Sequence, residues 1–193
     1  MLGRVTRLET QPTDAELVGA ACAGERSAKE ALFRRHVRAA ADRAYRLLGR
    51  DQELEDVVQE SFAQAFAALG RLEDGQAFAS WLSAIVTGTA IGVIRKRRLL
   101  ARLGIVRAEP VQLEALIAHS APPDVVAELR AVYGVIHELP APEHVVLILR
   151  RVEQLSLVEI AEQTGFSLAT VKRRLAAAEA RLARNVGIGK RHP

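Results

Sequence analysis

The stretch LEDVVQESFAQAFAAL, residues 54–69, has the clearest periodicity in this 193-residue chain. Its apolar and small residues recur at intervals of three and four, which places them on one face of an α-helix. That face consists of Leu54, Val57, Val58, Ser61, Phe62, Ala65, Phe66 and Leu69, and the opposite face carries Glu53, Asp56, Gln59, Glu60 and Gln64. An apolar helix face must be buried, so the stretch predicts a helix that packs against other helices.

Helices are also expected on both sides of this stretch. On the N-terminal side, Thr13 and Glu16 have the spacing of a capping box, and a helical pattern runs from there to residue 48 with an interruption at Gly24. On the C-terminal side, a polar break over residues 70–75 precedes a helix expected over residues 76–98. The residues expected to be buried on that helix are Phe78, Trp81, Leu82, Ile85 and Val86.

The composition favours helices over strands, since only 4% of the residues are aromatic. Proline and glycine punctuate residues 99–125, which predicts a flexible linker. The expected fold is therefore all-α, with two small helical domains: an N-terminal helical bundle over residues 1–98 and a C-terminal four-helix unit with a helix-turn-helix over residues 126–185. A short tail, residues 186–193, follows.

Residues 156–183 have the pattern of a helix-turn-helix. Ser156 and Glu159 have capping-box spacing, Gly165 supplies a left-handed turn, and Ser167 caps a second helix. The outward face of that helix is small and basic, with Ala169, Thr170, Lys172, Arg173 and Ala176, and with Arg174 at its edge. Such a helix suits the major groove of DNA. The alternative is a helical hairpin whose cations are only solvated.

Basic charge is concentrated in two stretches. Residues 95–107 hold six basic side chains and no acid, and residues 154–193 hold seven against three, while the other segments are net acidic. The run Arg95, Lys96, Arg97, Arg98 exceeds what stabilising a helix C-terminus needs, so a contact with phosphates is the better interpretation.

The sequence offers no support for an enzyme or for a bound cofactor. Cys22 is the single cysteine, which excludes a disulfide or a cysteine-based metal site within the chain. The five histidines lack ligand spacing, and no phosphate-binding loop or nucleophile motif occurs. No run reaches the roughly 18 apolar residues of a membrane span, so a cytoplasmic protein without membrane insertion is expected.

The order of these features resembles the extracytoplasmic-function (ECF) group of bacterial sigma factors, in the sigma-70 family. The LEDVVQESF of residues 54–62 is similar to the family's second conserved region, and FASWL at 78–82 with the basic run is similar to its promoter-opening segment. Leu139-Pro140, Leu155-Ser156, Glu159-Ile160-Ala161 and Thr170-Val171-Lys172 resemble its fourth region. The resemblance covers residues 13–98 and 126–183.

This resemblance implies a transcription initiation factor that directs core RNA polymerase to specific promoters. It implies that Glu55, Asp56, Gln59 and Glu60 contact the clamp helices of the β′ subunit, and that the fourth region touches the β flap. It also implies an anti-sigma protein as a partner. The implied DNA-binding residues of the N-terminal unit are Arg71, in the loop of residues 71–76 that would hold a flipped-out base, Trp81 in the segment that reads the minus-ten element, and Arg95, Lys96, Arg97 and Arg98 on the nontemplate strand or flanking phosphates. Those of the C-terminal unit are Ser167, Ala169, Thr170, Lys172, Arg173 and Arg174 at the minus-thirty-five element.

Several positions depart from the family pattern, among them three on which the function depends. Gly88 and Gly92 stand where the family usually has Asn and Asp, and His144 stands where Arg is usual. The two glycines remove polar groups from the face that should approach single-stranded DNA, which puts promoter melting or its sequence preference in question. Two alternatives stay open: a stand-alone helix-turn-helix regulator with an N-terminal interaction domain, and a degenerate sigma-like regulator.

Overall fold

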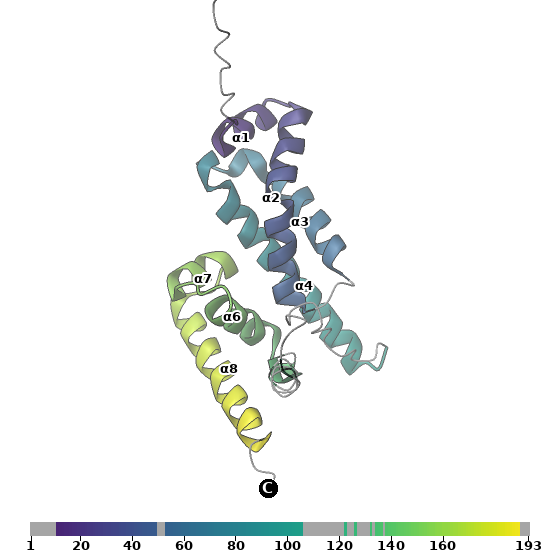
Figure 1. Cartoon of the computed structure of the whole chain (residues 1–193), viewed down its shortest axis with the longest axis vertical. Coiled ribbons are helices and arrows are strands. Elements are labelled where there is room, and N and C mark those ends of the chain that lie inside the picture. Colours follow the sequence, from purple (N-terminus) through teal and green to yellow (C-terminus); the bar gives the residue numbers. More distant parts are fainter. Residues whose placement is uncertain are drawn as a thin grey trace, which may run out of the picture.

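The computed structural model describes residues 11–49, 53–105 and 138–189, with six further positions between residues 122 and 136, and describes side chains as far as residue 184. This part of the chain is helical and contains no strand, which confirms the predicted all-α class. Figure 1 shows the helices α1–α4 as one group and α6–α8 as a second group, which lies beside the C-terminal half of α2 and α4.

Helix α1 (Asp14–Cys22) begins with the predicted capping box. The Thr13 N–H donates to Glu16 Oε2 over 2.7 Å, and the Glu16 N–H donates to Thr13 Oγ1 over 3.3 Å. Gly24, at φ +98°, then turns the chain into α2 (Arg26–Leu48). Arg35 of α2 pairs with Asp14 at 2.6 Å, so α1 is held against α2.

Helices α3 (Leu54–Ala68) and α4 (Phe78–Arg102) complete the N-terminal bundle with α2. The predicted stripe of α3 is buried at Val57, Phe62 and Ala65. On α4, the chain over residues 75–102 has the length and apolar composition of a membrane span. Its buried side chains, such as Phe78 and Val86, lie in the bundle core and make up 39% of the most apolar part of this segment.

The break between α3 and α4 contains two short 3-10 turns, η1 (Leu69–Arg71) and η2 (Gly75–Ala77). The second turn lies directly against α1. A Cβ atom added at Gly75 would stand 2.7 Å from the Cα of Ala15, closer than real Cβ atoms approach backbone. Glycine at position 75 is therefore what allows the turn and α1 to meet.

The C-terminal unit contains α6 (Ala141–Arg151), α7 (Leu157–Thr164) and α8 (Leu168–Gly189). The predicted helix-turn-helix is confirmed in its details. Ser156 and Glu159 form the capping box of α7, Gly165 adopts the left-handed conformation at φ +68°, and the Ser167 hydroxyl accepts from the Thr170 N–H over 3.2 Å.

Helix α6 is buried around its whole circumference. Val145, Val146, Leu147, Ile148 and Leu149 are each at most 2% exposed. Such a helix must be covered on more than one side. Helix α8 covers one side of α6, and α2 and α4 of the N-terminal unit cover another, while α7 packs on α4. The two units therefore share an extensive interface.

Several details differ from the sequence-based expectation. Helix α4 continues to Arg102 rather than ending at Arg98, because no helix-breaking residue occurs before Gly104 at φ +70°. The apolar residue Leu168 is 39% exposed, because it occupies the first position of α8 and the buried stripe of this helix begins one turn later at Val171.

Two further differences concern burial and coverage. Trp81 and Ile85 are half-buried rather than fully buried. Of the helix expected over residues 125–139, the described positions 126, 132, 134–136 and 138 are helical, and Leu139 forms a bend. The other positions lie outside the described residues, as does most of the predicted linker.

Replacing Gly75 with Ala is expected to lower the free energy of unfolding by about 1–3 kcal/mol, because the new methyl group overlaps Ala15 and the backbone must shift. The matched control is Gly70→Ala, where an added Cβ meets nothing within 4 Å and the change should stay within about 0.5 kcal/mol. Urea denaturation of both variants measures the difference. Equal stabilities would contradict the close approach.

Candidate polymerase and nucleic-acid interfaces

The predicted polymerase-binding residues share one exposed face of α3. Glu55, Asp56, Gln59 and Glu60 are all exposed, and they project from the side opposite the buried stripe. The Gln59 amide donates to Glu55 Oε1 over 2.9 Å, and the Gln64 amide donates to Glu60 Oε1 over 2.7 Å. These pairs one turn apart orient the carboxylates without removing their charge, so the face presents fixed negative groups to a partner.

The basic run at the end of α4 divides into two pairs. Arg95 and Lys96 are exposed. Arg97 instead forms a bidentate ion pair with Glu53 at 2.8 and 3.2 Å, and donates to the Leu48 carbonyl over 3.3 Å. This bond satisfies a carbonyl at the C-terminus of α2 that has no partner within the helix. Arg97 therefore joins α2, α3 and α4, while Arg95 and Lys96 face solvent.

Arg98, the last residue of the run, is half-buried. Desolvation lowers the pKa of its guanidinium, with Arg102 adding to the shift and Glu143 of α6 opposing it. Arg98 thus lies within the field of a carboxylate from the other unit.

The segment predicted to hold a flipped-out base lies between α3 and α4. Arg71 at the end of η1 is exposed. Asp74 caps the following turn, where its Oδ1 accepts from the Gln76 N–H over 2.9 Å. Trp81 is half-buried, and its ring centroid lies 6.2 Å from that of Phe78. The turn is therefore ordered by its own side chains and leaves Arg71 accessible.

The outward face of α8 is small and cationic, as predicted. Ser167, Ala169, Lys172 and Arg173 are exposed, and Thr170 is partly exposed with its hydroxyl 2.9 Å from that of Ser167. A helix N-terminus with exposed cations and small residues fits the major groove and its phosphates.

Arg174 behaves differently from its neighbours on α8. Its guanidinium lies 3.9 Å from Glu143 Oε1, and Arg181 lies 3.2 Å from Glu143 Oε2. Glu143 is 5% exposed, and a carboxylate so deeply buried needs paired cations. In this conformation Arg174 therefore balances the charge of a buried carboxylate within the protein.

Comparison with known proteins matches both units. A model of sigma-70 region 2 matches residues 32–99, and a model of sigma-70 region 4 matches residues 129–182. The ECF RNA polymerase sigma factor SigM of Mycobacterium tuberculosis (strain H37Rv) is 30% identical over 91% of this chain and 85% of its own length. SigW of Bacillus subtilis is 32% identical over 68% of this chain and 74% of its own. This chain belongs to the ECF group of the sigma-70 family.

Solved structures agree with this assignment. CnrH, in complex with the cytosolic domain of CnrY, superposes with a TM-score of 0.57 at 25% identity, over 89% of this chain and 95% of CnrH. The sigma factor RpoE of Bartonella quintana, in complex with the anti-sigma factor NepR, has the same fold, with a TM-score of 0.60 at 23% identity over 82% of this chain and 96% of RpoE. The predicted function of directing RNA polymerase to promoters is confirmed, and the matches to both units favour it over a stand-alone regulator.

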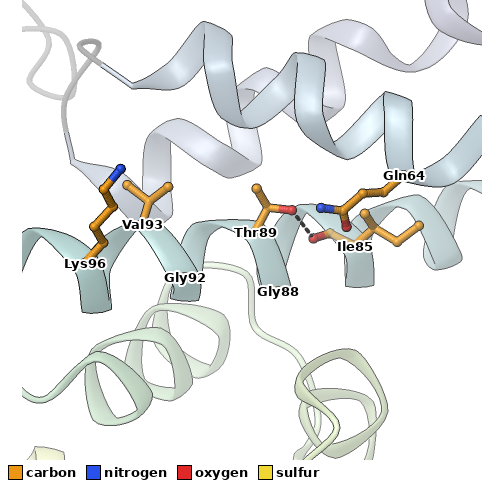
Figure 2. Close-up of a pocket in the computed structure, with 7 residues that line it drawn as sticks. All are labelled: Gln64, Ile85, Gly88, Thr89, Gly92, Val93 and Lys96. Carbon is orange, nitrogen blue, oxygen red and sulfur yellow. Dashed lines mark hydrogen bonds between the residues drawn. The ribbon is translucent and has the colours of Figure 1, made fainter.

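A groove that sequence reasoning missed lies between α3 and α4 of the sigma factor (Figure 2). It has a volume of about 480 Å³, and its lining residues are Gln64, Ile85, Gly88, Thr89, Gly92, Val93 and Lys96. Gly88 and Gly92 are exposed, and a Cβ at either would meet nothing within 4 Å. Packing therefore does not require glycine at these positions, and the two residues leave this side of the groove open.

His144 also has a structural role that could not be predicted from the sequence. Its ring is 2% exposed, with Nδ1 3.0 Å from the Ile136 carbonyl and Nε2 2.9 Å from the Leu47 carbonyl of α2. Burial, together with the nearby charges of Arg98 and Arg97, lowers the pKa of His144 to about 4, although both carbonyl contacts oppose the shift. A buried neutral imidazole thus joins α6 to the end of α2.

The His144→Gln variant is expected to lose part of the acid sensitivity of folding. Below pH 6.5 the unfolded chain binds a proton at His144 that the folded chain excludes until about pH 4, so the free energy of unfolding falls across this window, by up to about 3 kcal/mol at its lower end. Glutamine keeps an N–H donor for the Leu47 carbonyl but does not titrate. Denaturation curves from pH 7 to pH 4 measure the difference, and parallel pH profiles for the two proteins would contradict this assignment.

Proposed function

We propose that this sigma factor binds core RNA polymerase through the acidic face of α3 and binds promoter DNA through α4 and α8, with no catalytic step of its own. The supporting observation is that the exposed acids and the exposed cations occupy separate surfaces. Acids and amides lie on the outer face of α3, the groove between α3 and α4 is lined by Lys96, and cations lie at the start of α8. A bridging factor needs separate surfaces for protein and for DNA.

The proposed division of labour follows the two units. Residues 1–98, together with the end of α4, dock on the β′ clamp helices and open the promoter. Residues 126–185 read the minus-thirty-five element and touch the β flap, with residues 99–125 as the linker and residues 186–193 as the tail. The continuous helix to Arg102 supports placing the start of the linker a few residues after position 98.

In the N-terminal unit we assign the nontemplate strand to the groove of Figure 2. Ile85 and Val93 offer apolar surface for a base, and Lys96 stands at one end for a phosphate. Arg95 lies beside it on the same helix, and Arg71 and Trp81 lie near the turn that precedes α4. Because Gly88 and Gly92 contribute no hydrogen-bonding side chains, binding here should rest on apolar contact with Ile85 and Val93 and on the charge of Lys96 rather than on reading base edges.

In the C-terminal unit the proposed contacts are those on the exposed face of α8: Ser167, Ala169, Thr170, Lys172 and Arg173. Arg97, Arg98 and Arg174 also belong to the proposed DNA-binding set. Each of them faces a carboxylate of the protein in this conformation, Glu53 or Glu143. Their use on DNA therefore requires phosphates to replace those carboxylates.

We further propose a cytoplasmic location and control by an anti-sigma protein. Both solved structures described above are complexes with a protein partner, which supports this assignment. No group of three or more His, Cys, Asp or Glu side chains is placed to hold a metal within the described residues. The proposed mechanism uses binding energy alone, spent on unstacking bases and neutralising phosphates.

The double variant Asp56→Ala with Gln59→Ala should weaken binding to core polymerase at least tenfold, because it removes a charge and an oriented amide from the proposed docking face. Fluorescence anisotropy with purified core measures the affinity. The control is Asp42→Ala, which removes an exposed acid from α2 instead. Unchanged core affinity in the double variant, with helix content intact, would contradict the assignment.

The double variant Lys172→Ala with Arg173→Ala should weaken promoter binding by the holoenzyme and flatten its salt dependence. Loss of two phosphate contacts lowers the slope of log K against log salt by about two. Arg184→Ala serves as control, because it removes an exposed cation near the other end of α8. Equal salt slopes for the double variant and the parent would rule out phosphate contacts at these two positions.

A further inference from the structure

The two units are joined by a group of polar side chains that spans their interface. Arg43 of α2 is 8% exposed, and its Nη1 donates to Thr87 of α4 over 3.3 Å. The same guanidinium crosses to the C-terminal unit, where it donates to Gln163 of α7 and lies 3.4 Å from Glu153. Arg46, one turn later on α2, donates its Nε to the other oxygen of Glu153.

Glu153 is held in place for this contact. Its side chain is 13% exposed. Glu153 lies two residues after the end of α6, and its N–H donates to the Ile148 carbonyl over 3.2 Å. The next residue, Gln154, has a φ of +57°, a left-handed conformation that side chains other than glycine adopt rarely. The chain therefore accepts backbone strain immediately after the acid that meets both arginines.

A second contact connects the units around the N-terminus of α6. His144 lies 2.9 Å from the Leu47 carbonyl of α2. The adjacent Glu143 pairs with Arg174 and Arg181 of α8, and it also interacts electrostatically with Arg98 of α4. One buried carboxylate thus neutralises cations from both proposed DNA-binding elements.

In this packed arrangement the two DNA-binding elements lie too close together to reach both promoter elements. The minus-ten and minus-thirty-five elements are about 25 base pairs apart, which is about 85 Å of duplex at 3.4 Å per base pair. Here α7 contacts α4, and only a three-residue turn separates α7 from α8. The two DNA-binding elements are therefore a few helix diameters of about 10–12 Å apart.

We propose that Arg43, Arg46, Glu153 and Gln163 form an interdomain latch, which holds the free sigma factor in a closed state that cannot engage both promoter elements. This inference rests on the proposed function, since the need to open comes from the span of the promoter. Binding to polymerase must break the latch, so the apparent affinity for core equals the intrinsic affinity of the open state multiplied by the fraction of molecules that are open.

The test uses the full chain and two variants of the latch. Glu153→Arg places a cation against Arg43 and Arg46, and should raise the radius of gyration in small-angle scattering by several ångströms while circular dichroism stays unchanged. Gln163→Ala removes one contact without adding charge and should give a smaller increase. Both variants should bind core polymerase several-fold more tightly than the parent.

Glu162→Arg is the matched control, because it makes the same charge change at an exposed position of α7. A radius of gyration for Glu153→Arg equal to that of the parent and of the control would overturn the latch. If Glu153→Arg loses helix content, the Gln163→Ala variant decides by the same measurement. A parent chain that does not bind core at all would instead reject the proposed function, and the scattering series would still test the latch.

Discussion

Helix α6 has no polar face between Val145 and Leu149, and the rest of the architecture depends on covering it. One cover is α8 of its own unit. The other is the side of α2 and α4 in the N-terminal unit, which brings the ends of those helices against His144 and Glu143. The hydrophobic effect sets this arrangement, since it favours removing every side of such a helix from water.

The polar groups at this interface give it a specific geometry, and they also allow other charged partners to replace its ion pairs. A buried ion pair gains little over the hydration of its separated partners, because desolvation offsets most of the attraction. Arg43, Arg46 and Glu153 therefore select one register of the two units and hold it in addition to the apolar packing. At the other contact, a phosphate can replace Glu143 as the partner of Arg174.

The local parts of the fold were predictable from the sequence because their signals are local. Two capping boxes, the glycine turn at Gly165 and the apolar stripe of α3 each lie within a few residues. The exposed faces of α3 and α8 followed from the same periodicity. The sequence also shows the basic run at the end of α4. It does not show that Arg97 and Arg98 are half-buried while Arg95 and Lys96 are exposed.

Long-range partners gave no such signal. Arg97 meets Glu53 at a separation of 44 residues, and Arg43 meets Glu153 at a separation of 110. The sequence shows His144 only as a departure from the family pattern, because its contact with α2 depends on how the two units pack. Likewise, the groove at Gly88 and Gly92 combines residues of α3 and α4, so its lining could not be listed before the two helices were placed.

The most direct test of this account is the distance between the two units in the free and the promoter-bound sigma factor. Spin labels on Asp42→Cys of α2 and Glu162→Cys of α7, which adjoin the contacting residues Arg43 and Gln163, report it by pulsed electron paramagnetic resonance in a Cys22→Ser background. We predict one short distance in the free protein and a distance longer by tens of ångströms with core polymerase and promoter, in keeping with the ~85 Å between promoter elements. The same distance in both states would contradict the account.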